Sequence, residues 1–111
     1  MGLMSTSEFL EIGSPGSDGR RTMPVGGPAI GGGRGSLFGG VGLAAGIVAL
    51  EDEAGKPAVW ATGQYVSTLF PPAALDLDVT LSAVGRTVTQ GRVLGSHDGS
   101  EIITVVGAVG V

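Results

Sequence analysis

The longest apolar run of the chain predicts a buried helix. Residues 37–50 carry no charged side chain, and a run of this length is too short to span a bilayer but suits a core helix. Ser36 is a suitable N-cap, and Gly55 suits the position just after a helix end. Residues 51–53 are acidic and oppose the helix dipole, so we expect them either to point into water or to meet a partner.

Glycine is unusually frequent inside this predicted helix. Each of Gly39, Gly40, Gly42 and Gly46 costs about 1 kcal/mol of helix propensity relative to alanine. Gly42 and Gly46 stand four residues apart, as do Ala45 and Ala49, so they share a smooth face. We therefore expect a sheet or a neighbouring backbone to lie against that face.

The hydrophobic pattern changes to period two after the helix. Residues 60–70 are predicted as one strand that ends at two prolines, and residues 75–81 alternate as a half-buried strand does. Gly85 marks a turn into a strand over residues 87–94, and His97-Asp98-Gly99 marks a hairpin into residues 102–111. One helix followed by four hairpin-linked strands predicts the α+β class, with an antiparallel sheet curled around the helix.

Most of the clusters of glycine and proline, which favour turns and loops, precede the predicted helix. The 22 glycines and six prolines of this 111-residue chain approach the composition of disordered sequences. A hydrophobic fraction of 42% nevertheless leaves enough apolar surface for a core. We therefore expect an irregular arm over residues 1–36, with a short strand or a helical turn at residues 8–12, and a single domain over residues 37–111.

Charge and cysteine content exclude several classes of function. The net charge of −4 without a basic run argues against a nucleic-acid partner. The absence of cysteine excludes disulfides, thiolate metal sites and cysteine nucleophiles. The first residues lack the basic and apolar regions of a secretory signal. We expect a cytoplasmic protein that is not attached to a membrane.

Three short patterns are better explained without a catalytic role. Residues 40–45 satisfy GxGxxA, but no clear strand precedes them, as a dinucleotide site would require. His97 lies inside a turn signal and is expected at the surface. Asp76 and Asp78 form a same-face carboxylate pair on the wet side of a strand, where they serve solubility.

The start of the helix has more chemical promise. Phe38, Gly39 and Gly40 lie where free backbone N–H groups carry partial positive charge and can polarise a carbonyl oxygen. Glycine allows a ligand to reach those groups. The alternative is that small residues only let strands pack there, and the sequence leaves both open.

These features together resemble the hotdog fold, and specifically the acyl-CoA thioesterase family related to bacterial thioesterase II. The resemblance runs from residue 37 to about residue 110. It is carried by Leu37-Phe38-Gly39-Gly40, by Ala61-Thr62 through Phe70-Pro71-Pro72, and by Gly85-Arg86-Thr87-Val88-Thr89 through Asp98-Gly99.

The resemblance implies hydrolysis of fatty or other acyl-CoA thioesters to a free acid and CoA by activated water, without a metal or prosthetic group. Gly39 and Gly40 would hold the carbonyl oxygen, and Phe38 beside them is a further substrate-binding residue. The family positions the water with a carboxylate on the helix, a threonine on the next strand and an amide on the last strand. Thr62 matches the threonine.

The other two catalytic groups do not carry over. Residues 41–50 contain no acid, and residues 105–107 contain no amide. Gln64, two residues from Thr62 on the same strand face, is the candidate amide. The phosphates of CoA would meet Arg34, Arg86 or Arg92.

Related chains join two hotdog units, and this sequence resembles the first. We therefore expect a second unit, as a homodimer or a heterodimer, with the acyl-CoA substrate between the two. The apolar run over residues 102–111 fits half of such a protein. The alternative is a non-catalytic acyl-CoA binding module or the structural half of a heterodimer. A purely structural β-rich protein is a third, more remote reading.

Overall fold

The computed structural model describes residues 5–26, 30–31, 35–37 and 39–110 of the chain. Its elements, in order, are α1 (Thr6–Phe9), β1 (Arg21–Val25), β2 (Ile30–Gly31), β3 (Ser36–Leu37), α2 (Gly39–Ala54), β4 (Ala58–Tyr65), β5 (Ala73–Val84), β6 (Val88–His97) and β7 (Ser100–Gly110).

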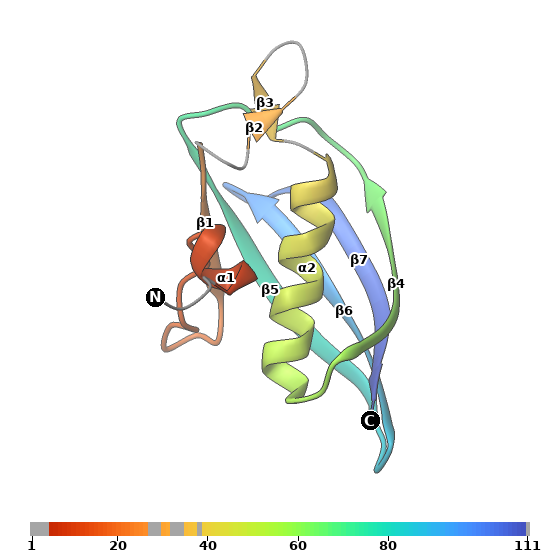
Figure 1. Cartoon of the computed structure of the whole chain (residues 1–111). Coiled ribbons are helices and arrows are strands. Elements are labelled where there is room, and N and C mark those ends of the chain that lie inside the picture. Colours follow the sequence, from red (N-terminus) through yellow and green to blue (C-terminus); the bar gives the residue numbers. More distant parts are fainter. Residues whose placement is uncertain (1–4, 27–29, 32–34, 38, 111) are drawn as a thin grey trace.

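Five of the strands form one antiparallel sheet in the order β1-β5-β6-β7-β4. Consecutive hairpins link β5, β6 and β7, whereas β1 and β4 lie at opposite edges. The sheet curves along α2, which lies against one of its faces (Figure 1). The expected α+β architecture, a curved antiparallel sheet around one long helix, is therefore confirmed.

The predicted helix is α2, displaced toward the C-terminus. It begins at Gly39 rather than at residue 37, because Ser36 and Leu37 form β3 instead. Ser36 is therefore not an N-cap. The helix ends as expected before Gly55, whose φ of 71° lies in the left-handed region. The Gly55 N–H donates to the Glu51 carbonyl at 2.8 Å.

The small residues of α2 do face the sheet. Its buried positions are Gly42, Ala45, Gly46, Ala49 and Leu50. A Cβ atom at Gly46 would collide with the side chain of Val105 on β7. The sheet therefore approaches α2 so closely that only glycine fits there, which explains the unfavourable helix propensity.

The strands differ from the prediction mainly at their ends. β5 keeps the expected alternation, with Leu75 and Leu77 fully buried. β4 stops at Tyr65 instead of continuing to residue 70, because the next two N–H groups both donate to one carbonyl, that of Ile102. The predicted hairpin is present: Asp98 and Gly99 have φ angles of 49° and 80°, as a tight two-residue turn requires.

The expectation of an irregular arm over residues 1–36 is wrong for β1. This strand pairs with β5 and buries Met23 and Val25. Its five residues include Pro24 and a charged residue, so the sequence showed too few alternating positions to indicate a strand. The turn or strand expected at residues 8–12 is a helical turn that starts earlier, at Thr6, capped by Ser5 and Glu8.

Of the two alternatives for the acidic end of α2, the structure shows the one in which the acids meet a partner. Asp52 and Glu53 form ion pairs with Arg21 of β1 at 2.8 and 3.0 Å, and Glu51 accepts the Ala58 N–H. Only 4% of the Arg21 side chain is exposed. The acids are therefore partners of a buried cation that the sequence pattern did not place.

The described helices do not include one that could cross a membrane by length and apolar character.

Candidate functional site

The first turn of α2 is open to the surroundings. Gly40 is exposed and Gly39 is half-buried. Backbone N–H groups at this position have no acceptor within the helix and carry partial positive charge. The turn contains no acidic residue that would neutralise them. Phe38, the third predicted substrate-binding residue, lies outside the described residues.

Tyr65, the last residue of β4, lies against this turn. A Cβ atom placed on Gly39 would lie 3.5 Å from the Tyr65 Oη, and one placed on Gly42 would lie 3.3 Å from the same atom. The glycines at these positions therefore leave room for the phenol ring. Of the two interpretations of the small residues, packing accounts for Gly42, while Gly40 stays accessible.

Tyr65 brings an ionisable side chain to this end of α2. Burial raises the pKa of its phenol, and a hydrogen bond with the Leu43 backbone lowers it by a smaller amount. The hydroxyl is therefore protonated at neutral pH and can donate a hydrogen bond.

A cleft of about 280 Å³ opens beside Tyr65. It lies between β3, the segment that follows β4 and the start of β7. Its apolar lining consists of Leu37, Val66, Leu69 and Ile102, and its hydroxyl groups come from Ser36, Ser67, Thr68 and Tyr65. The cleft thus joins an apolar surface to several hydrogen-bonding groups, as ligand sites commonly do.

Thr62 and Gln64 lie on the other face of the sheet. A Cβ atom at Gly63 would lie 3.2 Å from Leu43 Cδ1, so position 63 faces α2. Because strand side chains alternate, its neighbours Thr62 and Gln64 point away from the helix, and both are exposed. They share a face, as expected, but the sheet separates them from Gly39 and Gly40 of the same chain.

Sequence reasoning missed Tyr65. The small residues Ala61 and Gly63 mark the helix-facing positions of β4, since only small side chains fit beneath α2. Tyr65 follows Gly63 by two residues, so its side chain points to the same face of β4. Extending this alternation by two residues would have predicted that Tyr65 faces the N-terminus of the helix.

The arginines considered for CoA phosphates lie elsewhere. Arg86 is exposed in the β5–β6 turn, and Arg92 is exposed on β6 opposite Thr80 and Val106. Neither lines the cleft. Arg34 lies outside the described residues.

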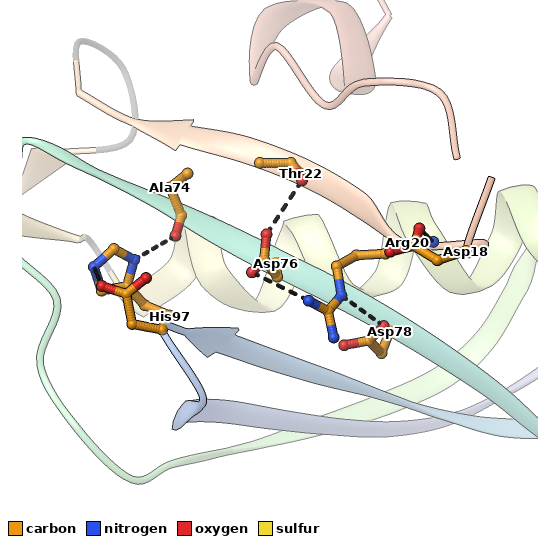
Figure 2. Close-up of polar contacts among 8 residues, drawn as sticks. Asp18, Arg20, Thr22, Ala74, Asp76, Asp78 and His97 are labelled. Carbon is orange, nitrogen blue, oxygen red and sulfur yellow. Dashed lines mark hydrogen bonds and ion pairs between the residues drawn. The ribbon is translucent and has the colours of Figure 1, made fainter. Parts of the chain in front are cut away.

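The carboxylates of β5 form polar contacts with a side chain of β1 and with Arg20, the residue before β1. Arg20 Nε donates to Asp78 Oδ1 at 3.0 Å, its Nη1 lies 3.6 Å from Asp76 Oδ2, and the Thr22 hydroxyl donates to Asp76 (Figure 2). His97 Nδ1 donates to the Ala74 carbonyl at 2.9 Å. These side chains fix β1 and the hairpin rather than form a catalytic group.

A larger cavity, of about 530 Å³, lies at the opposite end of α2. It separates the segment after α1 from the last turns of the helix, and Arg21 and Asp52 lie in its wall as an ion pair. No group of three His, Cys, Asp or Glu side chains in the described ranges is arranged to hold a metal ion.

No protein-family model matches the sequence, and no curated protein matches it. Solved structures do match. One is a protein from Novosphingobium aromaticivorans named as a thioesterase, with 32% identity and a TM-score of 0.80 over 83% of this chain. The chain spans 37% of the length of that protein.

Two other solved structures match over more of their length. A Bacillus halodurans protein crystallised with CoA has 17% identity and a TM-score of 0.79, over 98% of this chain and 76% of that one. A thioesterase enzyme from Staphylococcus aureus has 14% identity and a TM-score of 0.85, over 94% of this chain and 95% of that protein. The chain therefore has the hotdog fold that its sequence indicated, and its structural neighbours are proteins of the thioesterase superfamily.

Proposed function

We propose that this chain is an acyl-CoA thioesterase-like protein that binds its thioester at the first turn of α2. The observation that carries the proposal is the exposed glycine turn, free of acidic residues, beside a cleft whose lining combines apolar side chains with hydroxyl groups. The B. halodurans neighbour with CoA supports a CoA ester as the ligand. The carbonyl oxygen accepts from the Gly39 and Gly40 N–H groups, and the acyl group enters the cleft.

The proposed reaction is hydrolysis. A water oxygen attacks the thioester carbonyl carbon, the C–S bond breaks, and the CoA thiolate leaves and takes up a proton. The helix N-terminus stabilises the negative charge that develops on the carbonyl oxygen. The attacking water also has to lose a proton, and the described residues that line the cleft include neither a carboxylate nor a histidine. We therefore propose that a second hotdog unit supplies the base.

The edge strand β4 is the proposed contact with that unit. Residues 58–70 contain no charge, and the exposed fractions of Val59 and Trp60 are 64% and 50%. Edge strands are usually protected by charges, proline or a covering segment. β1 has such protection, because it contains Pro24 and the Gly13 N–H donates to its Thr22 carbonyl. Pairing through β4 would cover the unprotected edge, with either a second copy or a different unit.

The catalytic roles of Thr62 and Gln64 are proposals that apply to the paired assembly. Both side chains point away from the cleft of their own chain, so neither contributes to binding of the thioester there. Thr62→Ala should therefore leave KM unchanged while it lowers kcat at least tenfold, as expected when a group acts only in the transition state. Steady-state kinetics of the assembly test this, with thermal unfolding as the stability control. An unchanged kcat would remove Thr62 from the catalytic set.

A thiol-release assay over a series of acyl-CoA esters tests the proposed function, together with calorimetric binding of the same esters. We expect every active preparation to contain two hotdog units by light scattering. Binding without thiol release would support the second candidate, a non-catalytic acyl-CoA module, which the lack of a base at the cleft favours. Failure to bind any ester would contradict both. A cytoplasmic location, expected from the lack of cysteine, remains a prediction.

A further inference from the structure

The space behind Tyr65 is filled. A Cβ atom at Gly42 would lie 3.3 Å from the Tyr65 Oη and 3.5 Å from Ile103 Cδ1, so both side chains meet the same point of α2. A Cβ atom at Gly63 would lie 3.2 Å from Leu43 Cδ1 and 3.5 Å from the same Cδ1 atom of Ile103. Leu43 and Ile103 therefore occupy the next layer between helix and sheet.

The walls of the cleft are held by main-chain hydrogen bonds. The Leu37 N–H donates to the Leu69 carbonyl at 2.8 Å, which joins β3 to the segment after β4. The Val66 and Ser67 N–H groups donate to the Ile102 carbonyl at 2.8 and 3.3 Å. These bonds fix the backbone on both sides of the cleft.

The size and lining of the cleft point to a small acyl group. Its volume of about 280 Å³ is near the lower end of ligand sites, which span about 300 to 1,000 Å³. Hydroxyl groups of Ser36, Ser67 and Thr68 interrupt its apolar lining. A long alkyl chain would leave these groups without hydrogen-bond partners, whereas a short acyl group leaves room for water beside them.

Resting on the proposed function, we propose that Tyr65 closes the acyl pocket and that the chain selects short acyl groups over fatty acyl chains. The phenol ring forms the end wall, with Ile103 and Leu43 behind it. Removal of the ring exposes the glycine face of α2 and extends the apolar surface toward Ile103. Tyr65 is thus a specificity-determining residue, and its ring matters more than its hydroxyl.

Calorimetry with CoA and its acetyl, butyryl, hexanoyl and decanoyl esters tests the proposal on the assembled protein. Each methylene group that contacts apolar side chains strengthens binding several-fold. The chain length at which the affinity stops rising therefore marks the end of the pocket. We expect wild-type affinity to peak at butyryl-CoA or below and to be at least tenfold weaker for decanoyl-CoA. Tyr65→Ala should shift the peak to hexanoyl-CoA or beyond and strengthen decanoyl binding at least fivefold.

Leu94→Ala is the control that should keep the wild-type profile, because it removes an apolar side chain on the opposite sheet face. Tyr65→Phe tests the ring itself: it should keep the peak at the same ester, because the ring is retained. Thermal unfolding checks that each variant is folded, and Tyr65→Leu, a milder truncation, serves if the alanine variant is not.

The outcomes separate this inference from the proposed function. Decanoyl-CoA bound by the wild type as tightly as butyryl-CoA would overturn the chain-length selection and leave the proposed function standing. A folded truncation variant with the wild-type profile would overturn the role of Tyr65. If no ester binds more tightly than free CoA, the thioester site itself is wrong, and this inference is wrong with it.

Discussion

At the scale of single residues, Arg21 ties the N-terminal strand to the end of α2. Its Nε and Nη2 donate to Asp52 Oδ2 at 3.1 and 2.8 Å, and its Nη1 donates to Glu53 Oε1 at 3.0 Å. Burial lowers the pKa of Arg21, but the hydrogen bonds to Asp52 and Glu53 outweigh this effect and raise it. The cation therefore persists at every physiological pH and offsets two acids that oppose the helix dipole.

Arg21→Met should destabilise the protein by about 1–3 kcal/mol. The change leaves Asp52 and Glu53 unpaired at the negative end of α2, although their own exposure limits the penalty. The free energy of unfolding in urea measures the effect. The matched control is Arg20→Met, whose own side chain is far more exposed than that of Arg21 and whose loss should therefore cost less. Equal effects of the two substitutions would contradict the role given to Arg21.

Tyr65 is the only tyrosine of the chain, so its ionisation can be followed by ultraviolet absorbance. Burial raises its pKa above the ordinary value of about 10. We expect the tyrosinate signal of the folded protein to appear at higher pH than that of the unfolded protein in urea. Because the folded state holds the proton more tightly, stability should fall as the pH rises above about 10, until the folded pKa is reached.

Tyr65→Phe should remove that alkaline loss of stability. A folded midpoint at or below the urea midpoint would contradict the placement of the phenol against α2.

The residue scale also shows where sequence reasoning reached its limit. The glycine turn was identified because helix dipoles and glycine have local signatures. Tyr65 was missed because its contact depends on which face of β4 meets the helix, a parity that only the packed sheet fixes. A partner for Asp52 and Glu53 was one of the expected alternatives, but its identity could not be predicted, since Arg21 is more than 30 residues away in sequence.

At the scale of elements, β4 differs from the other edge strand. It presents apolar side chains and no charge, whereas β1 carries a proline and a covering segment. An unprotected edge of this kind pairs with another strand unless something blocks it. The single tryptophan, Trp60, lies on this strand and reports on its surroundings.

Val59→Lys should prevent pairing through β4. The substitution places a charge on the edge, where desolvation would oppose association. Light scattering of purified protein should give the mass of two units for the wild type and of one unit for the variant, and Trp60 emission should shift to longer wavelength. Val84→Lys is the matched control, since Val84 is 74% exposed at the end of β5. A paired Val59→Lys variant would contradict the proposed interface.

The elements themselves were largely predictable. α2 contains a long uncharged apolar run and ends before Gly55, and β5 to β7 are bounded by clear turn residues, so their type and order followed from the sequence. β1 did not, because a five-residue edge strand with Pro24 is stabilised by pairing with β5 rather than by its own pattern. The end of β4 depended on the hydrogen bonds to Ile102, which no local signal encodes.

At the scale of the whole molecule, the two ends of α2 differ in charge and role. The C-terminal end holds three acids and Arg21, and it fixes β1 to the helix. The N-terminal end has no acid in its first turn, opens beside a cleft and lies near the end of the unprotected strand β4. The fold thus keeps charge away from the proposed carbonyl site and leaves that site beside the proposed interface.

The most direct test of this account is whether the first-turn N–H groups of α2 hold the thioester. Gly39→Pro removes one N–H, and proline is tolerated in the first turn of a helix. Calorimetry should show at least tenfold weaker binding of butyryl-CoA with unchanged binding of free CoA, while Leu94→Ala binds both as the wild type does. Wild-type affinity of a folded Gly39→Pro variant for butyryl-CoA would contradict the central claim.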